Sequence, residues 1–268
     1  AINAHKTIIS VKHSQSVVSD LPKKYILPLI KYLELKGLKS NFEIKILQKS
    51  PSHIGLGSGT QLSLSIGMAI CKLFDLNLGV NDIANLYNRG KRSGTGISIF
   101  KQGGFVVDAC KKDRLLPRDM FKSKFPTDWR IIILNDTKLK GTSGKRENKF
   151  FSKSSRTNHK KLELAHILLR GILPSIVYED FQSFSKNLTE FQRNTAEFYR
   201  EKQKGIFLSP EISKIMEYVK NYDNLGIGQS SWGPMSYIFV ESKLHAKELL
   251  SIIQNKFNVY NNVQLNIV

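Results

Sequence analysis

The sequence predicts an α+β fold, with an N-terminal α/β half over residues 1–125 and a more helical C-terminal half over residues 126–268. Three observations support this class. Strand-like runs alternate with helical apolar patterns in the first half, two long helical patterns dominate the second, and 41% of the residues are apolar. A chain of 268 residues with this composition buries a large core without disulfide bonds.

The apolar periodicity of the first half predicts strands and helices in turn. Residues 42–47 alternate between apolar and polar side chains, as in a half-buried strand, whereas residues 21–35 have helical spacing. In chain order we expect a strand at 5–11, a helix at 21–35, a strand at 42–47, helices at 60–74 and 80–88, and two short strands around Gly103-Gly104 within 94–110.

The second half predicts mainly helices, followed by short strands. Pro174 is expected to break the helical pattern, and Ser209-Pro210-Glu211 is typical of a helix start. In chain order we expect a strand at 129–134, a mobile basic loop at 138–155, helices at 158–176 and 179–203, a helix from 209, a glycine-rich turn at 226–234, a strand at 237–240, a helix at 243–255 and a strand at 263–267.

The chain is strongly basic, with 41 Lys and Arg against 22 Asp and Glu and a net charge of +19. Residues 111–170 alone contain 17 Lys and Arg and 6 Asp and Glu. Such an excess indicates a solvated basic face, a ligand with several phosphates, or nucleic acid. Zinc-finger spacing, an aromatic RNA-binding strand motif and a heptad zipper are all absent from the sequence, so we expect no nucleic-acid partner.

Cysteine content and hydropathy bear on the cellular compartment. Cys71 lies in a helical apolar pattern and Cys110 ends a strand-like run, so both are expected to be reduced core thiols of a cytoplasmic protein. No apolar stretch approaches the roughly 20 residues of a membrane span, and no signal peptide is recognised. We therefore expect neither a membrane-spanning nor a secreted protein.

The first candidate site is the glycine-rich loop within residues 51–61, between an expected strand and an expected helix. Glycines let the backbone approach a ligand closely, and the amides and positive dipole of the following helix favour an anion. The spacing is that of neither a P-loop nor a dinucleotide fingerprint, and a purely structural turn is the alternative. His53 is either a donor to the same anion or an ordinary loop histidine; the other histidines show no metal-ligand spacing.

Two further regions carry polar side chains between glycines. Residues 88–96 contain Arg89 and Arg92 together with Ser93, and one guanidinium group can bind two phosphate oxygens at once. An exposed basic turn is the alternative there. Residues 226–234 place Gln229, two serines and Trp232 between glycines, where the Trp is either a core residue or a platform for a ring.

These three regions resemble the motifs of the GHMP superfamily, the small-molecule kinases of galactose, homoserine and mevalonate. In those kinases the middle motif resembles Ser-Gly-x-Asp, and its Asp is the catalytic carboxylate. Aligning Ser93-Gly94-Thr95 with that motif puts Gly96 where the Asp would stand. The first motif also departs from the kinase pattern, because Gly59-Thr60 replaces its second serine.

The departures match the β-ribofuranosylaminobenzene 5′-phosphate synthase family, over about residues 5–240. That family's opening strands are not recognised in this sequence, so no binding group from them is assigned. The residues that carry the resemblance are 55–61 (Gly-Leu-Gly-Ser-Gly-Thr-Gln), 89–96 (Arg-Gly-x-Arg-Ser-Gly-x-Gly), 103–108 (Gly-Gly-Phe-x-Val-Asp), 228–234 (Gly-Gln-Ser-Ser-Trp-Gly-Pro) and, less specifically, 141–147.

The resemblance implies a GHMP-kinase-like fold, with an N-terminal half of the ribosomal protein S5 type and a C-terminal half of helices on an antiparallel sheet. It implies transfer of phosphoribose from phosphoribosyl pyrophosphate to 4-aminobenzoate or 4-hydroxybenzoate, with loss of CO2 and pyrophosphate, in archaeal tetrahydromethanopterin biosynthesis. Two alternatives stay open: an ATP-dependent GHMP kinase whose base comes from elsewhere, and a non-catalytic protein of this fold that binds nucleotide or nucleic acid.

The resemblance also implies roles for individual residues. Mg²⁺ is implied by the pyrophosphate substrate, held mostly by phosphate oxygens and water because no paired-carboxylate signature is present. A homodimer is compatible with the sequence. The expected catalytic residues are Arg92, Lys101 and Asp108, and for Asp108 a structural acid at a strand end is the alternative. The expected phosphate-binding residues are His53, Gly55, Gly57, Ser58, Gly59, Thr60, Arg89 and Ser93; the expected substrate-binding residues are Gln229, Ser230, Ser231 and Trp232.

Overall fold

The computed structural model describes residues 2, 5–52, 54–91, 93–109, 116–141, 158–231, 233–258 and 260–268. The chain forms two compact units. The first comprises residues 1–52 and 57–124, and the second comprises residues 53–56 and 125–268. Each unit combines helices with an antiparallel or mixed sheet, which confirms the α+β class.

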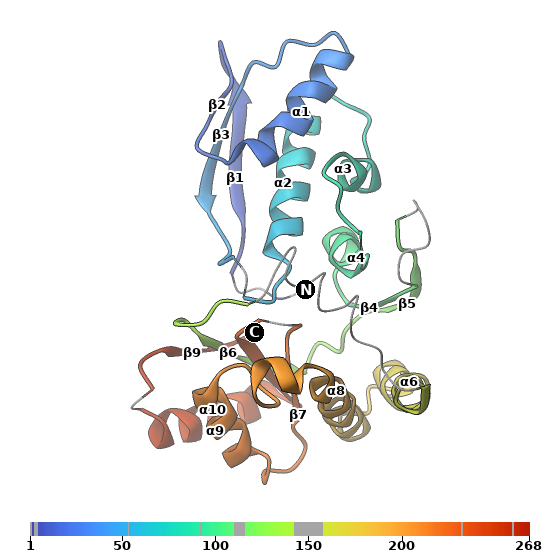
Figure 1. Ribbon diagram of the computed structural model, residues 1–268, viewed down its shortest axis with the longest axis vertical. Helices are drawn as coiled ribbons and strands as arrows, with labels where there is room; N and C mark the ends of the chain where they lie inside the picture. The colour runs from blue at the N-terminus through green and yellow to red at the C-terminus, as the bar shows by residue number, and fades with distance from the viewer. Residues whose placement is uncertain are drawn as a thin grey trace. The chain divides into compact units, whose positions relative to one another are not determined.

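In the first unit, helices cover one side of a three-stranded sheet of order β1-β3-β2 (Figure 1). Strand β3 pairs antiparallel with β1 and parallel with β2, and a separate hairpin joins β4 to β5. The elements are β1 (Ile8–His13), β2 (Val18–Ser19), α1 (Lys23–Leu35), β3 (Phe42–Gln48), α2 (Ser58–Leu73), α3 (Val80–Leu86), α4 (Thr95–Gln102), β4 (Phe105–Asp108) and β5 (Asp119–Ser123).

The core of this unit follows from the apolar periodicity. Helix α1 buries Leu29 and Leu33, one turn apart, and β3 buries the alternating Phe42 and Ile44. Helices α2 and α3 approach closely at Gly67, where a Cβ atom would lie 2.2 Å from Ile83 Cγ2. Packing therefore fixes the position of α2, the helix that follows the glycine-rich loop.

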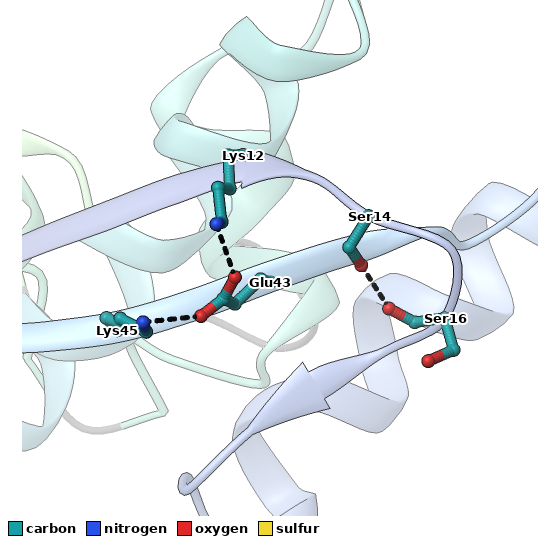
Figure 2. A network of polar contacts seen from close by, with 5 residues as sticks. All are labelled: Lys12, Ser14, Ser16, Glu43 and Lys45. Atoms are coloured by element: carbon teal, nitrogen blue, oxygen red, sulfur yellow. Dashed lines mark hydrogen bonds and ion pairs between the residues drawn. The ribbon is translucent and has the colours of Figure 1, made fainter.

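The β1–β3 pair has a charged network on its solvent-facing residues (Figure 2). The carboxylate of Glu43 accepts from Lys45 at 2.8 Å and from Lys12, its cross-strand partner, at 2.9 Å. Hydrogen bonds from Lys45 and then Lys12 lower the pKa of Glu43. At the end of β1, the Ser14 hydroxyl donates to the carbonyl of Ser16. This face is solvated, so the network ties the strands together without forming a site.

The second unit is built on a four-stranded antiparallel sheet of order β7-β8-β6-β9. Helices α9 and α10 cover the face that carries Ile132, Leu134 and Ile238, and α8 packs along the edge strand β7. The elements are β6 (Arg130–Asp136), α6 (Asn158–His166), the π-helix η1 (Ile167–Ile172), α7 (Leu173–Val177), α8 (Phe181–Gln203), α9 (Pro210–Val219), β7 (Gly226–Gln229), β8 (Met235–Val240), α10 (Lys243–Lys256) and β9 (Val263–Ile267).

Helix α8 is held to the sheet edge by specific contacts. The Thr189 hydroxyl donates to the carbonyl of Leu225 at 3.0 Å and accepts from the amide of Ile227 at 2.9 Å. Beside them Phe184 packs edge-on against Phe239 of β8, with ring centroids 5.3 Å apart. The two hydrogen bonds of Thr189 thus use backbone groups at the start of the edge strand β7 that would otherwise be exposed.

Four features of the secondary structure differ from the expectations. Residues 95–102 form helix α4 instead of a strand; the β-branched Ile97 and Ile99 suggested a strand, but the Asp108 carboxylate accepts from the Thr95 amide and caps the helix. Residues 226–229 of the expected turn form strand β7, and β5 was not anticipated. Pro174 lies in the first turn of α7, where its missing N–H costs little, and the helices separate after Val177.

Several expectations fall on residues outside the described part of the chain. These are Cys110 and residues 142–155 of the expected mobile loop. Cys71 is described, and it is a free, buried thiol whose pKa is raised by burial. None of the described helices is long and apolar enough to cross a membrane.

Candidate functional site

The glycine-rich loop is divided between the two units at Gly57. Residues 54–56 belong to the second unit, whereas Gly57, Ser58, Gly59 and Thr60 belong to the first. Gly57 caps helix α2 in a left-handed conformation, with φ of 64°, and its carbonyl accepts from the amides of Thr60 at 2.9 Å and Gln61 at 3.2 Å. The first turn of α2 has no acidic residue. The positive end of this 16-residue helix is therefore without a carboxylate from its own sequence.

Arg89 lies beside that helix start. Its guanidinium donates to Ser63 Oγ from Nε at 3.1 Å and from Nη2 at 2.8 Å, and Ser63 in turn donates to the carbonyl of Gly59 at 3.0 Å. A Cβ atom on Gly59 would lie 3.7 Å from Arg89 Nη1, so the guanidinium reaches the first turn of α2. A cation at the positive end of a helix favours an anion between them.

The chain around Arg89 is rigidly placed. Asn88 and Gly90 on either side both have positive φ, 53° and 76°, and the amide of Arg89 donates to the carbonyl of Ala84 at 2.7 Å. Tyr87 just before them donates its hydroxyl to the carbonyl of Tyr25 at 2.7 Å, and burial raises the pKa of this phenol. The turn after α3 therefore presents Arg89 in a fixed direction.

The start of helix α4 lies next to the start of α2. The side chain of Gln61 donates to the carbonyl of Gly96 at 2.9 Å, and a Cβ atom on Gly96 would lie 3.5 Å from Thr60 Cγ2. Two helix N-termini and Arg89 thus meet within the first unit. Gly96, which is expected from the sequence at the position of the kinase carboxylate, lies at that meeting point and has no side chain.

Asp108 lies at the same place, at the end of β4. Its Oδ2 accepts from the Thr95 amide at 2.9 Å, from Thr95 Oγ1 at 2.8 Å and from the Ser93 hydroxyl. The structure therefore brings Ser93 and Asp108 together, and Asp108 caps helix α4. Lys101 is exposed in the last turn of α4, about 9 Å along the helix axis from Thr95.

The third motif lies in the second unit with the first half of the glycine-rich loop. Ser230 Oγ donates to the carbonyl of Gly55 at 2.9 Å. Gly55 has φ of 102°, and a Cβ atom there would lie 2.5 Å from the carbonyl oxygen of Ser230. A Cβ on Gly233 would lie 2.5 Å from the carbonyl oxygen of Ile54. The glycines of both segments are thus needed for close backbone approach.

Gln229 has a structural role that the sequence did not reveal. Its Oε1 accepts from the amide of Leu208 at 2.7 Å, and its Nε2 contacts Gln203 Oε1 at 3.2 Å and the carbonyl of Ser231 at 3.1 Å. It therefore joins the end of α8 to the motif. Ser231 is exposed with φ of 55°, and together with Gln229 it lines a cavity of about 490 Å³.

Some expected site residues cannot be placed, and others were not expected. His53, Arg92 and Trp232 lie outside the described residues. Ser63 and Gln61 were missed, although their spacing one turn beyond Gly59 and Gly57 puts them on the face of α2 that meets Arg89 and Gly96. Among the described residues there is no group of three or more His, Cys, Asp or Glu that could hold a metal ion.

Comparison with known protein families gives a match in each of the two units. The GHMP kinases N terminal domain matches residues 22–104, and the GHMP kinases C terminal domain matches residues 172–259. The phosphomevalonate kinase of Streptococcus pneumoniae has the same fold, with a TM-score of 0.70 and 14% identity, covering 99% of this chain and 89% of that one.

Two archaeal relatives are named beta-ribofuranosylphenol 5′-phosphate synthase. The protein of Archaeoglobus fulgidus is 34% identical over 75% of this chain and 65% of its own length. That of Methanothermobacter thermautotrophicus is 30% identical over 77% of this chain and 66% of its own length. The chain thus spans just under two thirds of these relatives. The chain is similar to these synthases, and it belongs to the GHMP kinase superfamily, whose N- and C-terminal domain models it matches.

Proposed function

We propose that this protein transfers phosphoribose from phosphoribosyl pyrophosphate to an arylcarboxylate, with release of CO2 and pyrophosphate. The observation that carries the proposal is the meeting of Arg89, the start of α2 and the start of α4 around Gly96. This arrangement offers donors and positive charge to a polyphosphate, and it lacks a carboxylate at the position where the related kinases have their base. The named relatives support the same reading.

The reaction needs little proton transfer. The bond from C1 of the ribose to pyrophosphate breaks, and the ring carbon that bears the carboxylate forms a carbon–carbon bond to C1. The bond from that ring carbon to the carboxylate then breaks, CO2 leaves and the ring regains aromaticity. The step depends on neutralising charge on the leaving pyrophosphate, which preorganised donors do well.

We assign the leaving group to the first unit. The amides at the start of α2, with Ser58 and Thr60, and the guanidinium of Arg89 hold pyrophosphate in this proposal. His53, Arg92 and Ser93 belong to the same phosphate set by their place in the sequence, with Gly57 and Gly59 leaving room for the ligand. Gly55 does not belong to this set, because Ser230 of the second unit fills the space beside it. Lys101 is a weaker candidate for charge neutralisation, because it is exposed at the far end of α4.

Asp108 acts as a positioning residue in this proposal. By accepting from Ser93 and from Thr95, its carboxylate orders the start of α4 next to Gly96. The third motif, with Gln229, Ser230, Ser231 and Trp232, is assigned to the arylcarboxylate or the ribose phosphate. An aromatic residue such as Trp232 suits stacking on the acceptor ring.

Mg²⁺ belongs to the proposal as a companion of the substrate. The described residues do not form a carboxylate ligand set for it, and the Asp108 carboxylate already accepts three hydrogen bonds. Mg²⁺ keeps several waters and commonly binds to substrate phosphates. We therefore expect it to enter with pyrophosphate oxygens. We place the reaction in the cytoplasm, where reduced cysteines belong.

Both aryl acids are candidates for the acceptor. Loss of CO2 from 4-hydroxybenzoate leaves a phenol ring, which is the ring in the name of the relatives, whereas 4-aminobenzoate leaves an aminobenzene ring. A GHMP kinase remains the second candidate, since solved neighbours such as the phosphomevalonate kinase are kinases and a homoserine kinase of Saccharolobus islandicus is 27% identical over 33% of this chain. The kinase is the weaker candidate because Gly96 has no carboxylate to act as the base.

The test is an assay with carboxyl-labelled 4-aminobenzoate and, in parallel, carboxyl-labelled 4-hydroxybenzoate. We expect labelled CO2 from at least one acid, only when phosphoribosyl pyrophosphate and Mg²⁺ are both present. A matched reaction replaces phosphoribosyl pyrophosphate with ATP and offers mevalonate, homoserine or galactose. ADP formation there without CO2 release in the first assay would support the kinase, and neither product would support a binding protein without catalysis.

A further inference from the structure

A cavity of about 490 Å³ lies in the second unit, at the edge of the sheet. Helix α8 bounds it on one side of β7 and helix α9 on the other, and the segment joining these helices closes one end. Gln229 and Ser231 of the third motif line it as well. Its volume is in the range of small-molecule sites. All of its lining residues belong to one unit.

The body of the cavity is apolar. Ala196 of α8, Met216 of α9 and Ile227 of β7 line it from three directions, and Phe207 contributes from the segment between the helices. Ala196, Met216 and Ile227 are all buried in the structure. A planar ring with few polar atoms matches such walls, because it can exchange water for apolar contact on both faces.

One polar atom in the cavity wall is left for a ligand. The Oγ1 atom of Thr195 is buried and has no hydrogen-bond partner among the described residues. By contrast, the carboxamide of Gln229 is engaged at both ends by Leu208, Gln203 and Ser231. Buried polar groups are nearly always hydrogen-bonded in native proteins, so the Thr195 hydroxyl points to a bound polar group.

The cavity wall also carries an exposed cation. Arg193 lines it from α8, and no ion pair of Arg193 occurs among the described residues. Lys220, the residue that follows α9, is instead paired with Glu217. The charge balance of the wall therefore disfavours a cationic ligand.

We infer that this cavity holds the ring of the arylcarboxylate acceptor, with the 4-substituent at Thr195 and the carboxyl-bearing carbon towards Gln229 and Ser231. The inference rests on the proposed function and names the part of the protein that selects its acceptor. The shared chemistry is a benzoate with a hydrogen-bonding group opposite the carboxylate.

The geometry of α8 fits this orientation. Gln203 contacts Gln229, and Thr195 comes eight residues earlier on the same helix, which is about 12 Å along its axis. The carbon that forms the new bond is the one that bears the carboxylate, so that end of the ring has to face the motif that the proposal assigns to the reaction. The opposite end then points to the unpartnered hydroxyl of Thr195.

The test compares Thr195→Val, which removes only the hydroxyl, with Thr195→Ser, which keeps it. Calorimetric titration of the full chain with 4-hydroxybenzoate, 4-aminobenzoate and unsubstituted benzoate measures the three affinities. In the wild type we expect the substituted acids to bind roughly threefold to tenfold more tightly than benzoate. Thr195→Val should abolish this difference and Thr195→Ser should keep it. An unchanged difference in Thr195→Val would overturn the inference.

A second variant separates this inference from the proposed function. Ala196→Phe fills the cavity and should raise the KM for the aryl acid at least about tenfold while the KM for phosphoribosyl pyrophosphate stays unchanged. Wild-type CO2 release combined with an unchanged aryl KM in Ala196→Phe would refute the acceptor site and leave the function standing. The opposite result is that the wild type binds the aryl acid but releases no CO2, and that Ala196→Phe abolishes this binding. It would support the site and refute the function.

Discussion

The guanidinium of Arg89 makes two hydrogen bonds to Ser63 Oγ, at 3.1 and 2.8 Å, one turn into helix α2. These bonds hold a positive charge against the positive end of a helix that has no acidic residue in its first turn. Such an arrangement is electrostatically unfavourable without an anion. It connects the glycine-rich loop with the second motif, two segments that lie about thirty residues apart in the sequence.

Replacing Arg89 should weaken binding of phosphoribosyl pyrophosphate. Arg89→Ala removes a charge-assisted contact of about 1.5–3 kcal/mol, so the KM for this substrate should rise roughly tenfold or more. Arg89→Lys keeps the charge but not the paired donors, so its KM should lie between those of the wild type and Arg89→Ala. Steady-state kinetics measures this. Lys122→Ala removes an exposed cation of the same unit as a control, and an equal effect in both variants would remove the special role of Arg89.

The two left-handed glycines of the loop should respond differently to substitution. A Cβ on Gly55 would lie 2.5 Å from the Ser230 carbonyl oxygen, whereas a Cβ on Gly57 meets no described atom within 4 Å. Gly55→Ala should therefore reduce stability by about 2–4 kcal/mol, and Gly57→Ala by about 1 kcal/mol. Thermal unfolding measures both.

A larger side chain at Gly57 tests the ligand space directly. Gly57→Val should leave a folded protein that no longer binds pyrophosphate, because the added side chain points into open space beside the start of α2. Retained pyrophosphate affinity in a folded Gly57→Val protein would mean that this turn is only structural.

Restoring the kinase carboxylate should damage the proposed reaction. A Cβ on Gly96 would make ordinary contact with Thr60 Cγ2 at 3.5 Å, so Gly96→Asp is expected to fold. Its negative charge would repel pyrophosphate, and CO2 release should fall by about tenfold or more. Gly96→Asn is the uncharged control. If Gly96→Asp and Gly96→Asn lose activity equally, the cause is size and not charge.

Acid should remove the contribution of the cap of helix α8. The Asp180 carboxylate accepts from the Ser183 amide at 3.0 Å, and hydrogen bonds from the side chain and backbone of Ser183 lower its pKa. A lowered folded-state pKa stabilises the protein above the unfolded-state pKa, and this stability is lost as the pH falls through the folded-state value. Asp180→Ala should cost roughly 0.5–2 kcal/mol at pH 7 and less at pH 3, measured by urea unfolding. A pH-independent difference would contradict this assignment.

The sequence predicted the parts of the fold that depend on local periodicity. Helix α2, strand β3 and helix α10 follow from apolar spacing and lie within two residues of their expected bounds. Helix α4 did not follow, since its β-branched Ile97 and Ile99 suggest a strand and its cap, Asp108, comes from a later segment. Long-range capping of this kind leaves no local pattern.

The candidate site shows the same limit. The glycine and arginine motifs could be found from residue types, because those types carry the chemistry. Ser63, which orients Arg89, and Thr195, which lines the cavity, are ordinary helix residues in the sequence. The packing of α2 against the turn after α3 gives Ser63 its partner Arg89. The packing of α8 against β7 leaves the Thr195 hydroxyl without a partner among the described residues.

The most direct test of the account is the stoichiometry of a single reaction mixture. With phosphoribosyl pyrophosphate, Mg²⁺ and a carboxyl-labelled aryl acid, the account predicts one CO2 and one pyrophosphate for each aryl acid consumed, and a product whose ribose is joined to the ring through carbon. Pyrophosphate release without CO2, or no consumption of the aryl acid by folded protein, would contradict it.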